Sequence, residues 1–227
     1  MDGSAVKRSV SGRRPAGPLQ RHVLPSRQRR TQARQREILA AALHCFATIG
    51  FAATTLADIR ERAGASIGSI YHHFKSKEQL AAALYIEGLR DYQSEFLAEM
   101  GRHRRAAQAV RGIVRRHLQW VQAHPDLSRF LYEWRQAEFV LAREDAIKDL
   151  NEHFYQAAMV LWRRFADRND LVALPMDLFI AILLGPSQEF CRHWLAGRAH
   201  TRIEDAAGVL ADAAWRSLRS VEPRSAK

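Results

Sequence analysis

Hydroxyl, imidazole, phenol and ammonium groups are concentrated in residues 55–80, TLADIRERAGASIGSIYHHFKSKEQL. Groups of these kinds donate hydrogen bonds to phosphate oxygens, and helix N-termini add free backbone N–H donors. The polar spacing predicts two such termini, because Thr55 precedes Asp58 by three residues and Ser76 precedes Gln79 by three, which is the spacing of a capping box. The stretch therefore predicts a surface that grips a DNA backbone.

Two short helices joined by a turn are expected within this stretch. The first covers residues 56–63, and Gly64 can take the left-handed conformation that ends a helix. Ser66 is a good N-cap for the second helix. The buried side of that helix is expected to consist of Ile67, Ile70 and Phe74. A turn of three to four residues containing Gly indicates a helix-turn-helix.

At these residues the chain resembles the TetR family of bacterial transcriptional repressors. Two positions depart from the family pattern: Arg60 replaces the usual Ala, which affects packing or DNA distance, and Ala65 replaces the usual Val, which trims a core contact. The resemblance covers about residues 36–82. The positions that match are Thr55, Ile59, Ala63, Gly64, Ser66, Gly68, Tyr71, Phe74, Lys77, Glu78 and Leu80.

The resemblance implies a DNA-contact role for nine residues. Thr55 and Lys77 would contact phosphates from helix N-termini. Ile67 and Gly68 would approach base edges. The residues that would line the groove or the adjoining backbone are Ser66, Ser69, Tyr71, His72 and His73. Structural alternatives remain open, because Thr55 and Ser66 can serve as caps alone and Tyr71 as a half-buried core residue.

Side chains that read bases are scarce in the second helix. Between Ser66 and Phe74 there is no Arg, Asn, Gln or Lys, the residues that make bidentate contacts to bases. We therefore expect specificity from Ile67 against thymine methyl groups, from backbone approach at Gly68, and from DNA shape. Arginines of the N-terminal arm would enter a neighbouring minor groove. The alternative is that the arm only solubilises the protein.

Positive charge is concentrated at the N-terminus. Residues 1–36 hold ten Lys or Arg against one Asp, a net charge of +9 out of the +11 of the chain. We predict four regions: a disordered basic arm (1–33), a helix-turn-helix domain (34–80), a helical effector-binding and dimerisation domain (81–220) and a C-terminal tail (221–227).

The chain beyond the arm is expected to be all-α. Apolar residues recur at helical spacing throughout, and no strand is evident. Nine helices are predicted, the last of them opened by a capping box of Thr201 and Glu204. Their expected positions are about 35–49, 56–63, 66–74, 76–100, 110–121, 130–134, 147–165, 178–195 and 201–218. The last two are apolar on more than one side, and the resemblance implies that they form a four-helix homodimer interface. The alternative is that both faces are buried within one subunit.

Aromatic residues of the later helices are candidates for a ligand pocket. They are Trp120, Tyr132, Trp134, Phe139, Phe154, Trp162 and Phe190. Such density suits an apolar cavity that takes a small molecule, and it also suits an ordinary core.

Other classes of function find little support. The match of residues 64–68 to the G-x-S-x-G elbow of hydrolases lacks the strand that must precede Ser66. His72 and His73 diverge by about 100° on a helix, so no metal or cofactor is expected. Cys45 and Cys191 are expected to be buried thiols. No apolar run is long enough to span a membrane, and a cytoplasmic location is expected.

The sequence thus predicts a non-enzymatic, TetR-like regulator that represses from a palindromic double-stranded DNA operator and is released by a small-molecule effector. The alternative is a DNA-binding architectural protein without an effector.

Overall fold

The computed structural model describes residues 26–166, 168 and 170–220 of the chain. Within these residues it contains ten helices and no strand; the only ladder-like contact is an isolated bridge between Leu171 and Arg219. The helices are α1 (Ser26–Ile49), α2 (Leu56–Arg62), α3 (Ile67–His73), α4 (Lys77–Arg102), α5 (Ala106–Ala123), α6 (Pro125–Glu133), α7 (Glu138–Leu141), α8 (Glu144–Ala166), α9 (Met176–Leu195) and α10 (Ile203–Leu218). The all-α prediction is confirmed.

The predicted helices differ from those of the structure at several points. Helix α1 begins at Ser26, before the predicted end of the arm at residue 33, because Arg and Gln are good helix formers even without an apolar stripe. The four-residue α7 was not predicted. Helix α10 is preceded by Arg202 without a side-chain cap, since Glu204 instead accepts a hydrogen bond from Gln122 at 2.5 Å. Residues 1–25 of the predicted arm and the tail 221–227 lie outside the described residues.

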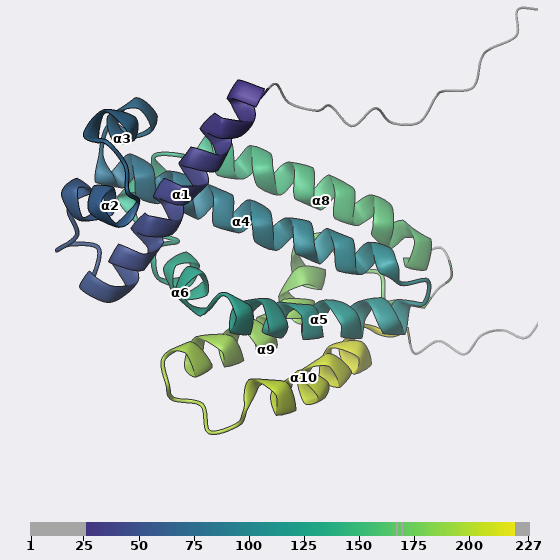
Figure 1. Cartoon of the computed structure of the whole chain (residues 1–227). Coiled ribbons are helices and arrows are strands. Elements are labelled where there is room, and N and C mark those ends of the chain that lie inside the picture. The colour runs from purple at the N-terminus through teal and green to yellow at the C-terminus, as the bar shows by residue number, and fades with distance from the viewer. Residues whose placement is uncertain (1–25, 167, 169, 221–227) are drawn as a thin grey trace, which may run out of the picture.

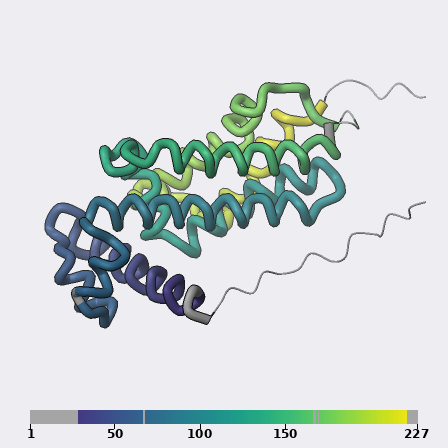
Figure 2. The backbone as a smooth tube through the Cα atoms, turned by 90° about the horizontal axis from the view of Figure 1, so that it is seen from above, coloured from purple at the N-terminus to yellow at the C-terminus, as the bar shows by residue number. Residues whose placement is uncertain are grey.

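The helices form a small N-terminal group at one end of a larger bundle (Figure 1). Helices α1, α2 and α3 gather beside the start of α4, which then runs the length of the molecule with α8 alongside it, as the view from above also shows (Figure 2). Helix α5 packs between α4 and α10, and α9 packs against both α5 and α10. None of the described helices is long and apolar enough to cross a membrane.

Two hydrophobic cores support this arrangement. One core joins α1, α2 and α3 to the first turns of α4. It also includes Phe130 of α6 and Val140 of α7. The other fills the bundle of α4, α5, α8, α9 and α10. The predicted boundary at residue 80 therefore does not separate the cores, because α6 and α7 contribute to the N-terminal one. Cys45 lies buried in the first core and Cys191 in the second, both as free thiols, as predicted.

Candidate nucleic-acid interface and ligand cavity

The turn between α2 and α3 is built as the sequence predicted. Gly64 has φ of +54°, in the left-handed region that favours glycine, and follows the last turn of α2. The Ser66 hydroxyl accepts a hydrogen bond from the backbone N–H of Ser69 at 3.2 Å and so caps α3. Ile70 and Phe74 are buried on the inner side. Residues 64–68 therefore do not have the geometry of the hydrolase elbow, because the element that precedes Ser66 is a helix and not a strand.

The outer side of α3 is open to solvent. Tyr71 is 53% exposed, which excludes the alternative that it is a core residue. Ser66, Gly68 and His72 are also exposed, whereas Ser69 and His73 are half-buried. The side chain of Ile67 lies outside the described part of the structure. Helix α3 thus presents one polar and aromatic face to an incoming partner.

Thr55 opens α2 through a complete capping box. Its hydroxyl accepts a hydrogen bond from the backbone N–H of Asp58 at 3.2 Å. Its backbone N–H and its hydroxyl in turn donate to Asp58 Oδ2 at 2.8 and 2.7 Å. The bond from the backbone N–H is the main reason that the pKa of Asp58 is lowered. Both donors of Thr55 are therefore engaged within the protein, and a phosphate would have to compete with Asp58 for them.

Lys77 occupies a different place from the one predicted. Its ammonium donates hydrogen bonds to the carbonyl oxygens of Phe51, Ala52 and Thr54 at 2.7, 3.1 and 2.9 Å, and it lies 4.7 Å from the centre of the Phe51 ring. An ammonium group has three protons, so these bonds use its full donor capacity. Lys77 therefore connects the start of α4 to the turn between α1 and α2, and a phosphate would have to compete with these carbonyls for its ammonium.

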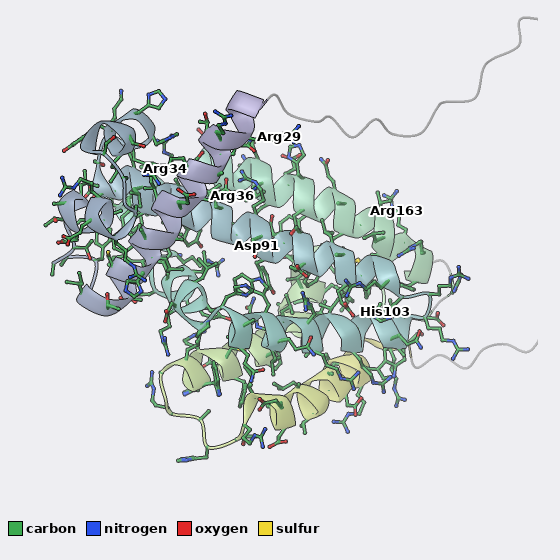
Figure 3. The ribbon with its side chains drawn as sticks, in the orientation of Figure 1. Arg29, Arg34, Arg36, Asp91, His103 and Arg163 are labelled. Carbon is green, nitrogen blue, oxygen red and sulfur yellow. The ribbon has the colours of Figure 1, made fainter. Side chains whose placement is uncertain are left out.

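Arg34 fixes the other side of the helix-turn-helix. From α1 its guanidinium reaches the carbonyl oxygens of Ala63 and Gly64 at 3.3 and 2.8 Å, and it also pairs with Glu37 at 2.6 Å (Figure 3). These carbonyls end α2, where a cation is favourable. The pKa of His73 is lowered, first by burial and then by His72 and Arg34. His73 is therefore neutral at pH 7.

A cavity of about 430 Å³ lies in the larger domain between α4, α5, α6, α8 and α9. This size is typical of small-molecule sites. Of the predicted aromatic residues, Trp120, Tyr132 and Phe154 line it. Its exposed lining residues include Arg135 and Glu144, and these mark the side that opens to solvent.

The other predicted pocket residues lie elsewhere. Trp134 packs against the N-terminal core, with its ring centre 4.9 Å from that of Phe51, and Phe139 stacks on Phe51 at 5.2 Å. Trp162 packs on Phe179 in the larger core. Phe190 is packed against that same core. These residues were wrongly assigned, because helical spacing does not say which apolar side faces a void.

The sequence also missed three polar residues that line the cavity. Gln93, His117 and Ser128 are 6%, 4% and 1% exposed. Gln93 Oε1, His117 Nε2 and Ser128 Oγ are buried atoms without a hydrogen-bond partner. Such atoms are rare in folded proteins and call for an explanation. Gln93 could have been noticed from sequence, since it stands in the apolar stripe of its helix.

A hydrogen-bond network holds these side chains in place. Gln93 Nε2 donates to Asn151 Oδ1 at 2.8 Å, and the hydroxyl of Tyr92 lies 3.0 Å from His117 Nδ1. Burial lowers the pKa of His117 to about 4, so its ring is neutral at pH 7. Burial also raises the pKa of Tyr92.

The same short segment lines the cavity and contacts the N-terminal core. Leu131 of α6 and Val140 of α7 belong to both the cavity wall and the packing of that core. Helix α4 approaches α6 closely at Gly88, where an added Cβ would lie 2.8 Å from Leu127 Cδ1. A ligand that displaced α6 or α7 would therefore act directly on the packing of the helix-turn-helix. No group of three or more metal-ligating side chains occurs among the described residues.

Fold and site define an all-α protein in which a capped helix-turn-helix is packed against a larger helical domain that contains a cavity. Residues 38–84 match the family model of the bacterial regulatory proteins of the tetR family. The match covers 47 of the 227 residues, so the similarity to this family is established for the helix-turn-helix region.

Curated transcriptional regulators are similar to parts of this chain. The transcriptional repressor AcnR of Corynebacterium jeikeium is 41% identical over 68 residues, which are 30% of this chain and 35% of that protein. The repressor KstR2 of Mycolicibacterium smegmatis is 48% identical over 60 residues, 26% of this chain and 27% of that protein. The regulator RutR of Escherichia coli is 35% identical over 106 residues, 45% and 48% respectively. The chain thus matches about a quarter to a half of the length of these relatives.

Solved structures extend the similarity to the whole fold. A TetR-family regulator from Marinobacter aquaeolei has a TM-score of 0.66 and 17% identity, covering 85% of this chain and 99% of that one. The regulator FadR of Bacillus subtilis, solved in complex with stearoyl-CoA, has a TM-score of 0.67 and 16% identity, covering 79% and 96%. At such identities the likeness establishes the fold alone.

Proposed function

We propose that the protein is a homodimeric transcriptional repressor, acting in the cytoplasm, that binds a palindromic operator through α3 and is released by a small molecule. The observation that carries this function is the outer face of α3, which is exposed to solvent. The helix is capped at Ser66, and the capping bond leaves that face uncovered. Helices presented in this way enter the major groove of DNA.

The DNA contacts proposed for α3 come mainly from its exposed residues. Ser66, Gly68, Tyr71 and His72 are exposed, and Ile67 lies between Ser66 and Gly68 at the start of α3. Because this face lacks Arg, Asn, Gln and Lys, DNA shape and additional basic residues carry part of the recognition. Residues 1–25 remain the proposed minor-groove arm.

Helices α9 and α10 are the proposed dimer interface. Val209 of α10 is 68% exposed and Leu178 of α9 is 49% exposed, so each helix keeps apolar surface outside the core of its own subunit. A two-fold dimer would place two α3 helices in successive major grooves about 34 Å apart. Substituting Val209→Asp should therefore shift the protein to a monomer, as measured by light scattering, without lowering its helix content.

Release by a ligand follows from the position of the cavity. Its wall includes residues of α6 and α7 that also pack on the N-terminal core. A ligand that favours another position of these helices would change the spacing of the two α3 helices, and a coupling of about 1–3 kcal/mol loosens DNA about 5- to 150-fold. A fold neighbour that carries stearoyl-CoA indicates that this fold can hold a ligand.

Selection of binding sites from random DNA tests the proposal. A repressor should yield a palindrome and prefer it over random DNA by at least ~10³. Equal affinity for all sequences would contradict operator recognition and favour an architectural protein. Deletion of residues 1–25 should lower the salt slope by ~0.9 for each phosphate that the arm neutralises. An unchanged slope would exclude the arm from the DNA.

A further inference from the structure

The cavity has two chemically different parts. Its buried lining residues include Gln93, His117 and Ser128, each of which has one polar atom without a hydrogen-bond partner, together with Trp120. Its exposed side carries one cation and one anion, Arg135 and Glu144. No Lys, Arg, Asp or Glu lies among the buried lining residues. A charged group placed at the buried end would therefore lose its hydration without gaining a counter-ion, which is costly.

The unpartnered atoms offer both donors and acceptors. The Ser128 hydroxyl can donate and accept, and whichever way the Gln93 amide is oriented, one of its polar ends stays unpaired, since the other is bound to Asn151. His117 Nε2 donates when the Tyr92 hydroxyl donates to Nδ1, and accepts in the other tautomer. The buried end can therefore satisfy a hydroxyl, a carbonyl or an amide group.

Aromatic side chains form much of the remaining wall. Tyr85, Tyr92, Trp120, Tyr132, Phe154 and Tyr155 all line the cavity. Rings of a ligand pack well against such faces, with centroids about 4.5–7 Å apart. The volume of about 430 Å³ leaves room for a fused ring system.

We infer that the cavity binds a neutral, ring-bearing molecule whose hydroxyl, carbonyl or amide group hydrogen-bonds to His117, Ser128 and Gln93 at the buried end. The inference rests on the proposed function only for the role of this molecule as effector. It assigns the three polar residues to ligand recognition, and it excludes carboxylates and other anions from the buried end of the cavity.

Three probes with one ring system test the chemistry: 2-naphthol, 2-methylnaphthalene and 2-naphthoate, titrated calorimetrically into the full chain. The hydroxyl probe should bind at least about fivefold more tightly than the methyl probe, the gain expected from a neutral hydrogen bond to an otherwise unpaired group. The carboxylate should bind most weakly. Tightest binding of the carboxylate, equal affinities for all three, or binding of none would overturn the inference.

A pair of serine variants locates the effect. Ser128→Ala removes the unpartnered hydroxyl and should reduce the preference for 2-naphthol over 2-methylnaphthalene by about fivefold. Ser187→Ala is the matched control, because Ser187 is equally buried, does not line the cavity and donates to the Leu184 carbonyl at 2.8 Å. It should leave the preference unchanged. A preference that survives both Ser128→Ala and His117→Gln would overturn the assignment of these residues.

The outcome is separate from that of operator selection. Probe binding is measured without DNA, so a failed ligand inference leaves a selected palindrome intact. A failed selection would equally leave the probe ranking in place and remove only the role of the ligand as effector.

Discussion

The two domains differ in what they do with polar side chains. Around the helix-turn-helix, Thr55, Ser66, Arg34 and Lys77 bind backbone groups or a neighbouring carboxylate and thereby fix the shape of the exposed face. In the larger domain, three residues that line the cavity each have a buried polar atom without a partner. Under the proposed function, the N-terminal domain would be complete before it meets DNA, whereas the larger domain would be completed by a ligand.

Acidification should have the largest effect on stability, because His117 is buried without a full set of hydrogen-bond partners. Its folded-state pKa of about 4 lies below its ordinary value of 6.5, so the unfolded chain binds the proton more tightly. The free energy of unfolding is therefore highest above pH 6.5. It falls by about 3 kcal/mol as the pH drops towards 4, because protonation of His117 favours the unfolded chain. Urea unfolding across this range measures it.

Substitution isolates this contribution. His117→Gln should remove that part of the pH dependence, while His153→Gln, at an exposed position, should not. Equal slopes for both variants and the parent protein would mean that His117 titrates normally and that the cavity is well hydrated.

Loss of the Lys77 ammonium should have the next largest effect. Lys77→Met leaves three carbonyl oxygens without their donor and should lower the free energy of unfolding by about 2 kcal/mol. Lys75→Met, at an exposed lysine two residues away, should change it by less than about 0.5 kcal/mol. If Lys77→Met instead weakened DNA binding with no loss of stability, the residue would be a phosphate contact after all.

The capping box of α2 should contribute about 1 kcal/mol. Thr55→Ala removes the hydroxyl that caps the helix and should cost this amount in chemical unfolding. Thr48→Ala serves as control, since the Thr48 hydroxyl bonds back to the carbonyls of His44 and Cys45 within α1 and its loss is expected to be nearly neutral. A cost at Thr48 equal to that at Thr55 would show that the box adds nothing.

The smallest expected effect compares a hydrogen-bonded hydroxyl with a hydroxyl that has no partner. Ser187→Ala removes a hydrogen bond and should destabilise the protein by about 0.5–1 kcal/mol, whereas Ser128→Ala removes an unpartnered group and should be neutral or slightly stabilising. Thermal unfolding of the two ligand-free variants measures the difference. Equal losses would indicate that Ser128 has a partner in solution, and the contrast between the domains would weaken.

Local features were predictable from the sequence, and contacts between distant segments were not. The spacing of Thr55 and Asp58 identified the box of α2, and the residue type of Ser66, just after Gly64, identified the cap of α3. Lys77 bonds to carbonyls 23 to 26 residues away, which no local pattern reveals. Its position at a helix N-terminus suggested an anion, but tertiary contacts bind its ammonium to the protein.

The cavity illustrates the same limit. Tyr132 and Trp134 lie two residues apart at the end of α6, yet Tyr132 lines the cavity and Trp134 packs on Phe51. Helical periodicity indicated that both are partly buried, but two different cores meet at α6. Which side faces the void depends on how α4 and α8 are placed, and that is a property of the whole fold.

The way α3 is held has a consequence for changing what the protein recognises. Its inner side chains Ile70 and Phe74 and its cap Ser66 provide the attachment, while Gly68, Tyr71 and His72 face outward. The outward positions can therefore be randomised in a library with little cost to folding. The cavity lies outside α3, so under the proposed function such variants would respond to one shared inducer, and the chain would serve as a scaffold for sensors that share one input and control different promoters.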